Sequence, residues 1–253
     1  HKLKFPALFL IVVLILSCNH TPKVKELKKT SESTYVTPVN TITDDLVSFI
    51  SGIPGNKSEC FSKLDSMVKW NHYASELDNM FSHANSFRFK KMKIWADSEI
   101  IRNQSITTVF YPFSGPDFLN ANIFYPDADQ YIMIGLEPIG NLPDICSIRP
   151  DSVKSYLNKI NNSLRDIFKR SYFITKRMDN DLRKTKVNGT IPLISLFIKR
   201  TGHQIVSIQR IGIDSEGKLQ IIDSFKNKKS IVPGIKIDFL SISKKKVQSV
   251  FYF

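Results

Sequence analysis

The apolar residues of this chain change their spacing partway along it, and this change limits the folds that the chain can adopt. Between residues 58 and 101 they recur every three or four positions, as on one face of a helix. From Ile205 onwards, β-branched and aromatic runs lie between short turn sequences, which is typical of strands. Helices first and strands last predict an α+β fold, with a helical N-terminal half, a small central strand-helix-strand unit and C-terminal antiparallel hairpins.

Besides a short helix in the central unit, five segments are expected to be helical. They are residues 44–50, 58–84, 87–101, 151–170 and 190–200. The expected N-terminal caps, whose side chains can accept hydrogen bonds from free backbone N–H groups, are Thr43, Thr190 and either Asp151 or Ser152. In the third helix, four apolar residues recur at helical spacing and are expected in the core: Phe87, Met92, Trp95 and Ile100.

The expected strands fall in two groups. Residues 106–111 and 130–136 flank a short helix at 117–124 and form the central unit. The C-terminal hairpins pair residues 205–213 with 219–225, and residues 235–242 with 247–253. The chain stops inside the apolar run of the last strand, which is expected either for a final strand or for a chain truncated at its C-terminus.

The first 18 residues have the layout of an export signal. Lys2 and Lys4 precede an apolar run of about 12 residues, which is followed by Ser17 and Cys18. A helix needs roughly 20 apolar residues to cross a bilayer, so this run is too short for a permanent span. A cysteine at this position is where a bacterial lipoprotein is cleaved and acylated, so we expect a lipid anchor on Cys18. Ordinary secretion with a free Cys18 is the alternative.

Residues 19–41 are polar and rich in Pro, Ser and Thr, so we expect a flexible stalk between the signal peptide and the folded part. Residues 42–253 then form a single globular α+β domain, large enough to bury its own core. Asn19 follows the cysteine with no acidic cluster behind it, which favours the periplasmic face of the outer membrane. His1 in place of a methionine indicates a clipped or altered start.

Two further cysteines, Cys60 and Cys146, would share an oxidising compartment if the chain is exported. They can form a disulfide or remain as two buried thiols, since sequence alone does not place them within bonding distance. Neither has a nearby cysteine or histidine at the spacing of a zinc site. No metal and no cofactor is therefore expected.

The chain is basic, with a formal net charge of +13. Its lysines are spread along the sequence without interleaved arginine and aromatic residues, so no nucleic-acid partner is expected. The expected partners are the membrane, through the lipid anchor, and an unidentified envelope ligand or protein.

The most unusual segment runs from Tyr111 to Phe118 and reads YPFSGPDF, and a GLEP segment, 135–138, follows it. In these two segments the chain resembles a set of uncharacterised exported bacterial lipoproteins, and the resemblance extends over about residues 60–253. It implies an exported lipoprotein but no particular activity.

Three polar residues of these segments are candidate catalytic groups. If the central unit is a parallel strand-helix-strand unit, Ser114, Asp117 and Glu137 lie at the carboxyl ends of adjacent strands, where open sheets bind ligands. Ser114 could act as a nucleophile, the two carboxylates as acid and base, and His203 could join them from a distant loop. The alternative is turn and capping chemistry, because Pro, Gly, Ser and Asp are ordinary turn residues.

Two functions are compatible with these observations. The first is a membrane-anchored envelope lipoprotein whose domain binds or scaffolds a partner without catalysis. The rival is a hydrolase or transferase that acts on an envelope substrate through Ser114, Asp117, Glu137 and His203. Whether the chain is an enzyme stays open at this point.

Overall fold

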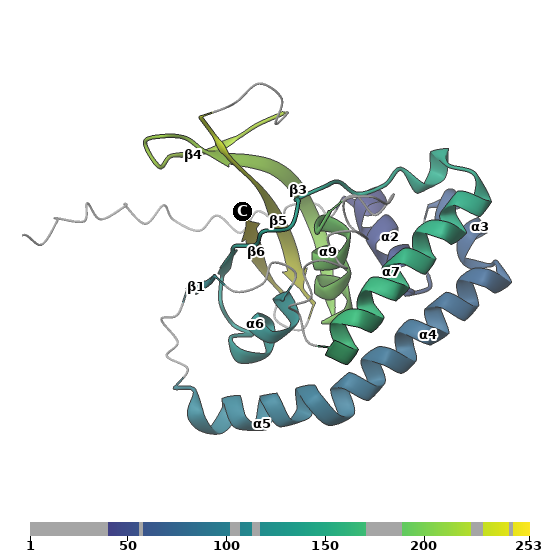
Figure 1. Ribbon diagram of the computed structural model, residues 1–253, viewed down its shortest axis with the longest axis horizontal. Coiled ribbons are helices and arrows are strands. Elements are labelled where there is room, and N and C mark those ends of the chain that lie inside the picture. Colours follow the sequence, from purple (N-terminus) through teal and green to yellow (C-terminus); the bar gives the residue numbers. More distant parts are fainter. Residues whose placement is uncertain are drawn as a thin grey trace, which may run out of the picture. The chain divides into compact units, whose positions relative to one another are not determined.

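Figure 1 shows the computed structural model of the chain, which describes residues 40–55, 58–101, 107–112, 117–170, 189–223, 230–242 and 245–253. Cys18, the stalk up to residue 39 and Ser114 lie outside the described residues. The described residues fall in one compact unit, Thr37–Phe253. Their buried apolar side chains form one hydrophobic core, so this unit carries its core within itself.

In the described part of the chain, six strands form one mixed sheet in the order β1-β2-β6-β5-β3-β4. Their bounds are β1 Thr108–Tyr111, β2 Gln130–Met133, β3 His203–Ile213, β4 Leu219–Ile221, β5 Val232–Ser241 and β6 Lys246–Tyr252. β1, β2 and β6 are parallel to one another, whereas β6, β5, β3 and β4 pair antiparallel. The α+β prediction is confirmed, but the strands do not form separate units, because β2 pairs with β6.

The helices lie mainly in the N-terminal half. They are α2 Thr41–Ile50, α3 Glu59–Asp65, α4 Val68–Ala84, α5 Lys90–Glu99, α6 Phe118–Phe124, α7 Pro150–Arg170 and α9 Ile191–Arg200, with a π-helical turn η1 at Asn85–Phe89 and a 3-10 turn η2 at Ile145–Ser147. α4 and α7 pack side by side (Figure 1). α9 packs against α2 and β3, and all its residues from Ile191 to Ile198 are buried.

The predicted caps differ from the observed ones. Asn40 caps α2, since its side chain accepts a hydrogen bond from the backbone N–H of Thr43 (3.2 Å). Thr43 itself lies inside the helix. Thr190 occupies the N-cap position of α9, but its hydroxyl donates to the carbonyl of Pro138 (3.3 Å) and makes no capping bond. α7 begins at Pro150, so Asp151 lies in its first turn.

The prediction that Phe87 and Trp95 belong to the core is wrong. Their exposed fractions are 60% and 54%, whereas Phe89 and Ala96 are buried. The π-helical turn η1 widens the helix between α4 and α5, and this changes which residues of the following turns face inward. A pattern read with a constant helical period therefore misplaces Phe87 and Trp95, whereas Met92, which was also expected in the core, is half-buried and packs against it.

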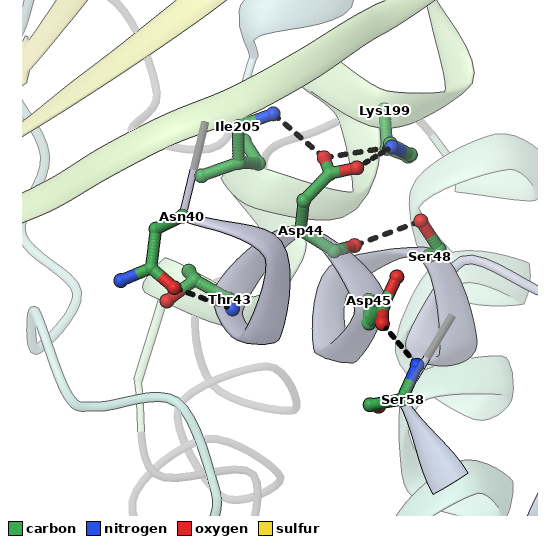
Figure 2. A network of polar contacts seen from close by, with 8 residues as sticks. All are labelled: Asn40, Thr43, Asp44, Asp45, Ser48, Ser58, Lys199 and Ile205. Atoms are coloured by element: carbon green, nitrogen blue, oxygen red, sulfur yellow. Dashed lines mark hydrogen bonds and ion pairs between the residues drawn. The ribbon is translucent and has the colours of Figure 1, made fainter. Parts of the chain in front are cut away.

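An ion pair with low exposure links α2 to α9 and β3 (Figure 2). The carboxylate of Asp44 accepts hydrogen bonds from the Nζ atom of Lys199 (2.7 and 2.6 Å) and from the backbone N–H of Ile205 (2.8 Å). The side chains of Lys199 and Asp44 are only 11% and 13% exposed. The next residue, Asp45, accepts a hydrogen bond from the backbone N–H of Ser58 (2.7 Å). Adjacent carboxylates thus hold α2 against the sheet and against the segment before α3.

Cys60 and Cys146 form a disulfide in the structure, with their Cα atoms 6.0 Å apart. Cys60 lies in α3, and Cys146 lies in η2, four residues before α7 begins. The bond therefore connects two helical segments that are 86 residues apart in the sequence.

Candidate functional site

The parallel strands place two tyrosines in one row at the carboxyl edge of the sheet. Tyr111 ends β1 and pairs in register with Met133, which pairs with Tyr252 at the end of β6. Side chains in one row point to the same face, and strands are about 4.8 Å apart, so the two tyrosine Cα atoms are roughly 10 Å apart. Asp117 and Glu137 contact these tyrosines, and we call the four residues the carboxyl-edge cluster.

Asp117 is almost completely buried, with 3% of its surface exposed. Its Oδ2 atom accepts hydrogen bonds from the Tyr111 hydroxyl (2.6 Å) and from the side-chain amide of Asn120 (3.0 Å). Its Oδ1 atom has no hydrogen-bond partner among the described residues. Burial raises the pKa of Asp117 to about 6, although the hydrogen bonds and the charge of Arg88 oppose this shift. A carboxyl group with this pKa can exchange a proton near neutral pH.

Glu137 follows β2 and is half-buried. Its backbone carbonyl accepts a hydrogen bond from the Tyr252 hydroxyl (3.0 Å). Its carboxylate Oε2 atom is buried and has no hydrogen-bond partner in the part of the chain that the structure describes. Burial, followed by the nearby charge of Glu137, raises the pKa of Tyr252. Both Asp117 and Glu137 therefore present a carboxylate oxygen without a described partner.

His203 makes no contact with Asp117 or Glu137 among the described residues, although its ring lies near that of Phe118, the residue after Asp117 (6.4 Å between centroids). His203 in β3 pairs with Ser241 in β5, and Ser241 pairs with Lys246 at the start of β6. Lys246 lies six residues before Tyr252, so the row of His203 and the row of Tyr252 are six residues apart along β6. At about 3.3 Å per residue, roughly 20 Å separates the two rows. The imidazole packs against the ring of Phe239 (4.9 Å between centroids), and burial lowers its pKa. The structure thus brings Asp117 and Glu137 to one edge, His203 contacts neither of them within the described part of the chain, and Ser114 lies outside the described residues.

A pocket lies elsewhere, between the corner that joins α3 to α4 and the first turns of α7. It has a volume of about 590 Å³, within the range of roughly 300–1,000 Å³ that small-molecule sites occupy. Its apolar lining comes from Phe49, Leu64, Met67, Val68, Trp70, Tyr73, Val153 and Leu157. We call it the α3–α4–α7 pocket.

The polar atoms of the pocket's aromatic residues are already satisfied. The indole N–H of Trp70 donates to the carbonyl of Phe49 (3.0 Å), and the Tyr73 hydroxyl donates to the carbonyl of Ile50 (2.5 Å). The rings of Phe49 and Trp70 are stacked, with centroids 5.8 Å apart. These bonds fix the orientation of the rings, so the pocket presents preformed apolar surface to a ligand.

The charged residues that line the pocket are mostly cationic. They are Lys63, Lys69, Lys154 and one acidic residue, Asp151. Lys63 pairs with Glu59 (2.6 Å), which is exposed. The pocket therefore combines an apolar interior with an excess of positive charge. Sequence reasoning missed it, because its residues belong to separate helical stripes that only the packing of α4 on α7 brings together.

The described residues contain no group of three or more histidine, cysteine, aspartate or glutamate side chains that could hold a metal ion. Within the same residues, no helix is both long enough and apolar enough to cross a membrane.

Comparisons with known proteins give no match: neither models of protein families, nor curated proteins, nor solved structures match this chain.

Proposed function

We propose that this protein is a membrane-anchored envelope lipoprotein whose domain binds a small ligand with an apolar body and an anionic group. The observation that carries the ligand class is the α3–α4–α7 pocket, whose lining is apolar and whose charges are mainly those of lysines. The lipobox-like sequence that ends at Cys18, and the resemblance of the YPFSGPDF and GLEP segments to exported lipoproteins, support the anchor. Asn19 follows Cys18 with no acidic cluster behind it, which supports a location at the periplasmic face of the outer membrane.

The anchor is tested in a bacterial host that acylates lipoproteins. The full chain should incorporate a clickable palmitate analogue, and Cys18→Ser should abolish the label. Equal labelling of both proteins would contradict the anchor.

The pocket is tested by titrating the unit Thr37–Phe253 with dodecanoate and with two molecules of the same chain length, neutral dodecanol and cationic dodecyltrimethylammonium. We expect saturable binding of dodecanoate, because the cations at the pocket favour its carboxylate over the other head groups. Val68 lines the pocket and is 83% exposed, so Val68→Asp should weaken dodecanoate binding at least tenfold without unfolding the domain.

Val232→Asp is the matched control for this titration, since Val232 is 54% exposed on β5 and does not line the pocket. The triple variant Lys63→Gln, Lys69→Gln and Lys154→Gln should weaken the binding of dodecanoate but not that of dodecanol. No saturable binding, or equal binding by Val68→Asp, would contradict the proposal.

The second candidate function is acid–base catalysis at the carboxyl-edge cluster, as a hydrolase or transferase of an envelope substrate. It is favoured by the buried carboxyl group of Asp117, whose pKa is raised to about 6 and whose Oδ1 atom has no described partner. Catalytic groups often destabilise the fold that holds them, whereas structural caps stabilise it. The stability of an Asp117 variant therefore distinguishes the two roles.

Asp117→Asn should make the unit more stable at neutral pH and leave its stability unchanged near pH 4. The pKa of Asp117 is about 6 in the folded state against an ordinary 3.8, so between these values the folded state retains a proton that the unfolded state has lost. Stability consequently falls as the pH rises from about 4 to about 6, and the total loss is about 3 kcal/mol. Asparagine does not ionise, so the variant lacks this loss.

The measurement is urea unfolding of both proteins between pH 4 and pH 8. A clear destabilisation by Asp117→Asn at pH 7.5 would establish a structural role for the carboxylate and exclude the catalytic candidate.

A further inference from the structure

Helix α5 and the turn before it expose large apolar side chains beside basic ones. Phe87, Ile94 and Trp95 are 60%, 61% and 54% exposed. Four cations lie among them, and all but Arg88 are exposed: Arg88, Lys90, Lys91 and Lys93. We call these seven residues the α5 surface. Within α5, only Ala96 is buried, so most of this helix faces away from the core.

The charge on the α5 surface is only partly balanced. Lys93 pairs with Asp97 (3.0 Å), whose side chain is 42% exposed. Lys90 and Lys91 have no acidic partner among the described residues. Single exposed apolar residues are normal on a protein surface, but three of them within nine positions, interleaved with cations, indicate an interaction site.

We propose that the α5 surface binds the face of an anionic phospholipid bilayer. Interfacial helices combine Trp and Phe side chains, which enter the head-group region, with Lys and Arg side chains, which bind lipid phosphates. The α5 surface carries both kinds of residue on one exposed segment. The charge of the α5 surface favours an anionic bilayer over a second copy of the chain as the partner, because pairing two such surfaces would bring eight cations together.

This surface complements the lipid anchor without depending on it. The unit Thr37–Phe253 does not contain Cys18, so vesicle binding by this unit is measured without any contribution from the anchor. The pocket is also independent, since none of the seven residues lines it.

The two tryptophans of the chain make the contact directly observable. Trp70 is 4% exposed and Trp95 is 54% exposed, so lipids brominated on their acyl chains should quench Trp95 selectively. With phosphatidylglycerol vesicles, the emission should shift to shorter wavelength and be quenched. Phosphatidylcholine vesicles should produce neither effect, and Trp95→Phe should remove the quenching.

The charge requirement is tested with two triple variants that lose the same charge. Each Lys near an anionic surface is worth about 1 kcal/mol, so Lys90→Gln, Lys91→Gln and Lys93→Gln together should lower the vesicle partition coefficient roughly a hundredfold. The pocket variant Lys63→Gln, Lys69→Gln and Lys154→Gln should partition as the unchanged protein does.

Three results would overturn the proposal. The first is an equal effect of the two triple variants, which would mean that net charge alone drives adsorption. The second is equal binding to phosphatidylcholine. The third is a blue shift of Trp95 that depends on protein concentration without vesicles, which would assign the α5 surface to a second copy of the chain.

Discussion

Replacing Cys60 and Cys146 by serine is expected to lower the free energy of unfolding by between about 4 and 5 kcal/mol. The disulfide joins residues 86 positions apart, and closing a loop of this length in the unfolded chain costs about that much entropy. The bond also connects α3 to the turn before α7, and both α3 and α7 contribute residues to the α3–α4–α7 pocket. We therefore expect the double variant to bind dodecanoate more weakly.

The measurement is urea unfolding of the unit Thr37–Phe253, with the reduced parent protein as a second sample. Reduction and double substitution should give the same midpoint if the loss comes from the cross-link. A loss below about 1 kcal/mol would contradict the disulfide as a stabilising feature.

The second large effect is expected for Asp44→Ala, which should destabilise the domain by about 3–5 kcal/mol. The substitution leaves the ammonium group of Lys199, 11% exposed, without its carboxylate. It also removes the acceptor of the backbone N–H of Ile205, a residue with no exposed surface. An unpaired buried N–H costs about 1–3 kcal/mol, which contributes to the total.

The control for Asp44→Ala is Glu59→Ala, which breaks the ion pair between Glu59 and Lys63. Both of these side chains are mainly exposed, at 82% and 73%, and pairs of this kind are worth about 0–1 kcal/mol. Lys199→Met tests whether the charge of Lys199 causes the destabilisation, since this substitution removes the charge but keeps much of the apolar side chain. If Asp44→Ala were no more harmful than Glu59→Ala, the pair would not hold α2 in place.

The elements themselves were largely predictable, because they depend on local patterns. The helix predicted for residues 151–170 is found at Pro150–Arg170, and the one predicted for 190–200 at Ile191–Arg200. The strand predicted for 235–242 is found at Val232–Ser241. Strand pairing was less accessible. Alternation shows that a segment is a strand but not which neighbour it has, so the pairing of β2 with β6 could not be read from the sequence.

The candidate sites were likewise predictable where they depend on local patterns, and not where they depend on strand pairing. Asp117 and Glu137 were expected at one sheet edge if the central unit is parallel, and β1 and β2 are parallel. His203 was a candidate only because histidine is chemically suited to catalysis, and its position follows from a strand register that the sequence does not show. Phe87 and Trp95 of the α5 surface were expected in the core, because nothing in the spacing of these residues indicates the π-helical turn.

The position of β6 in the sheet has a consequence for how the chain is made. β6 lies between β2 and β5 and is the link between β1–β2 and β5–β3–β4, yet it follows all of them in the sequence. A ribosome releases the chain from its N-terminus, so the two halves of the sheet cannot join until residues 246–252 have emerged. The sheet of a nascent chain therefore stays in two separate parts until β6 has been synthesised.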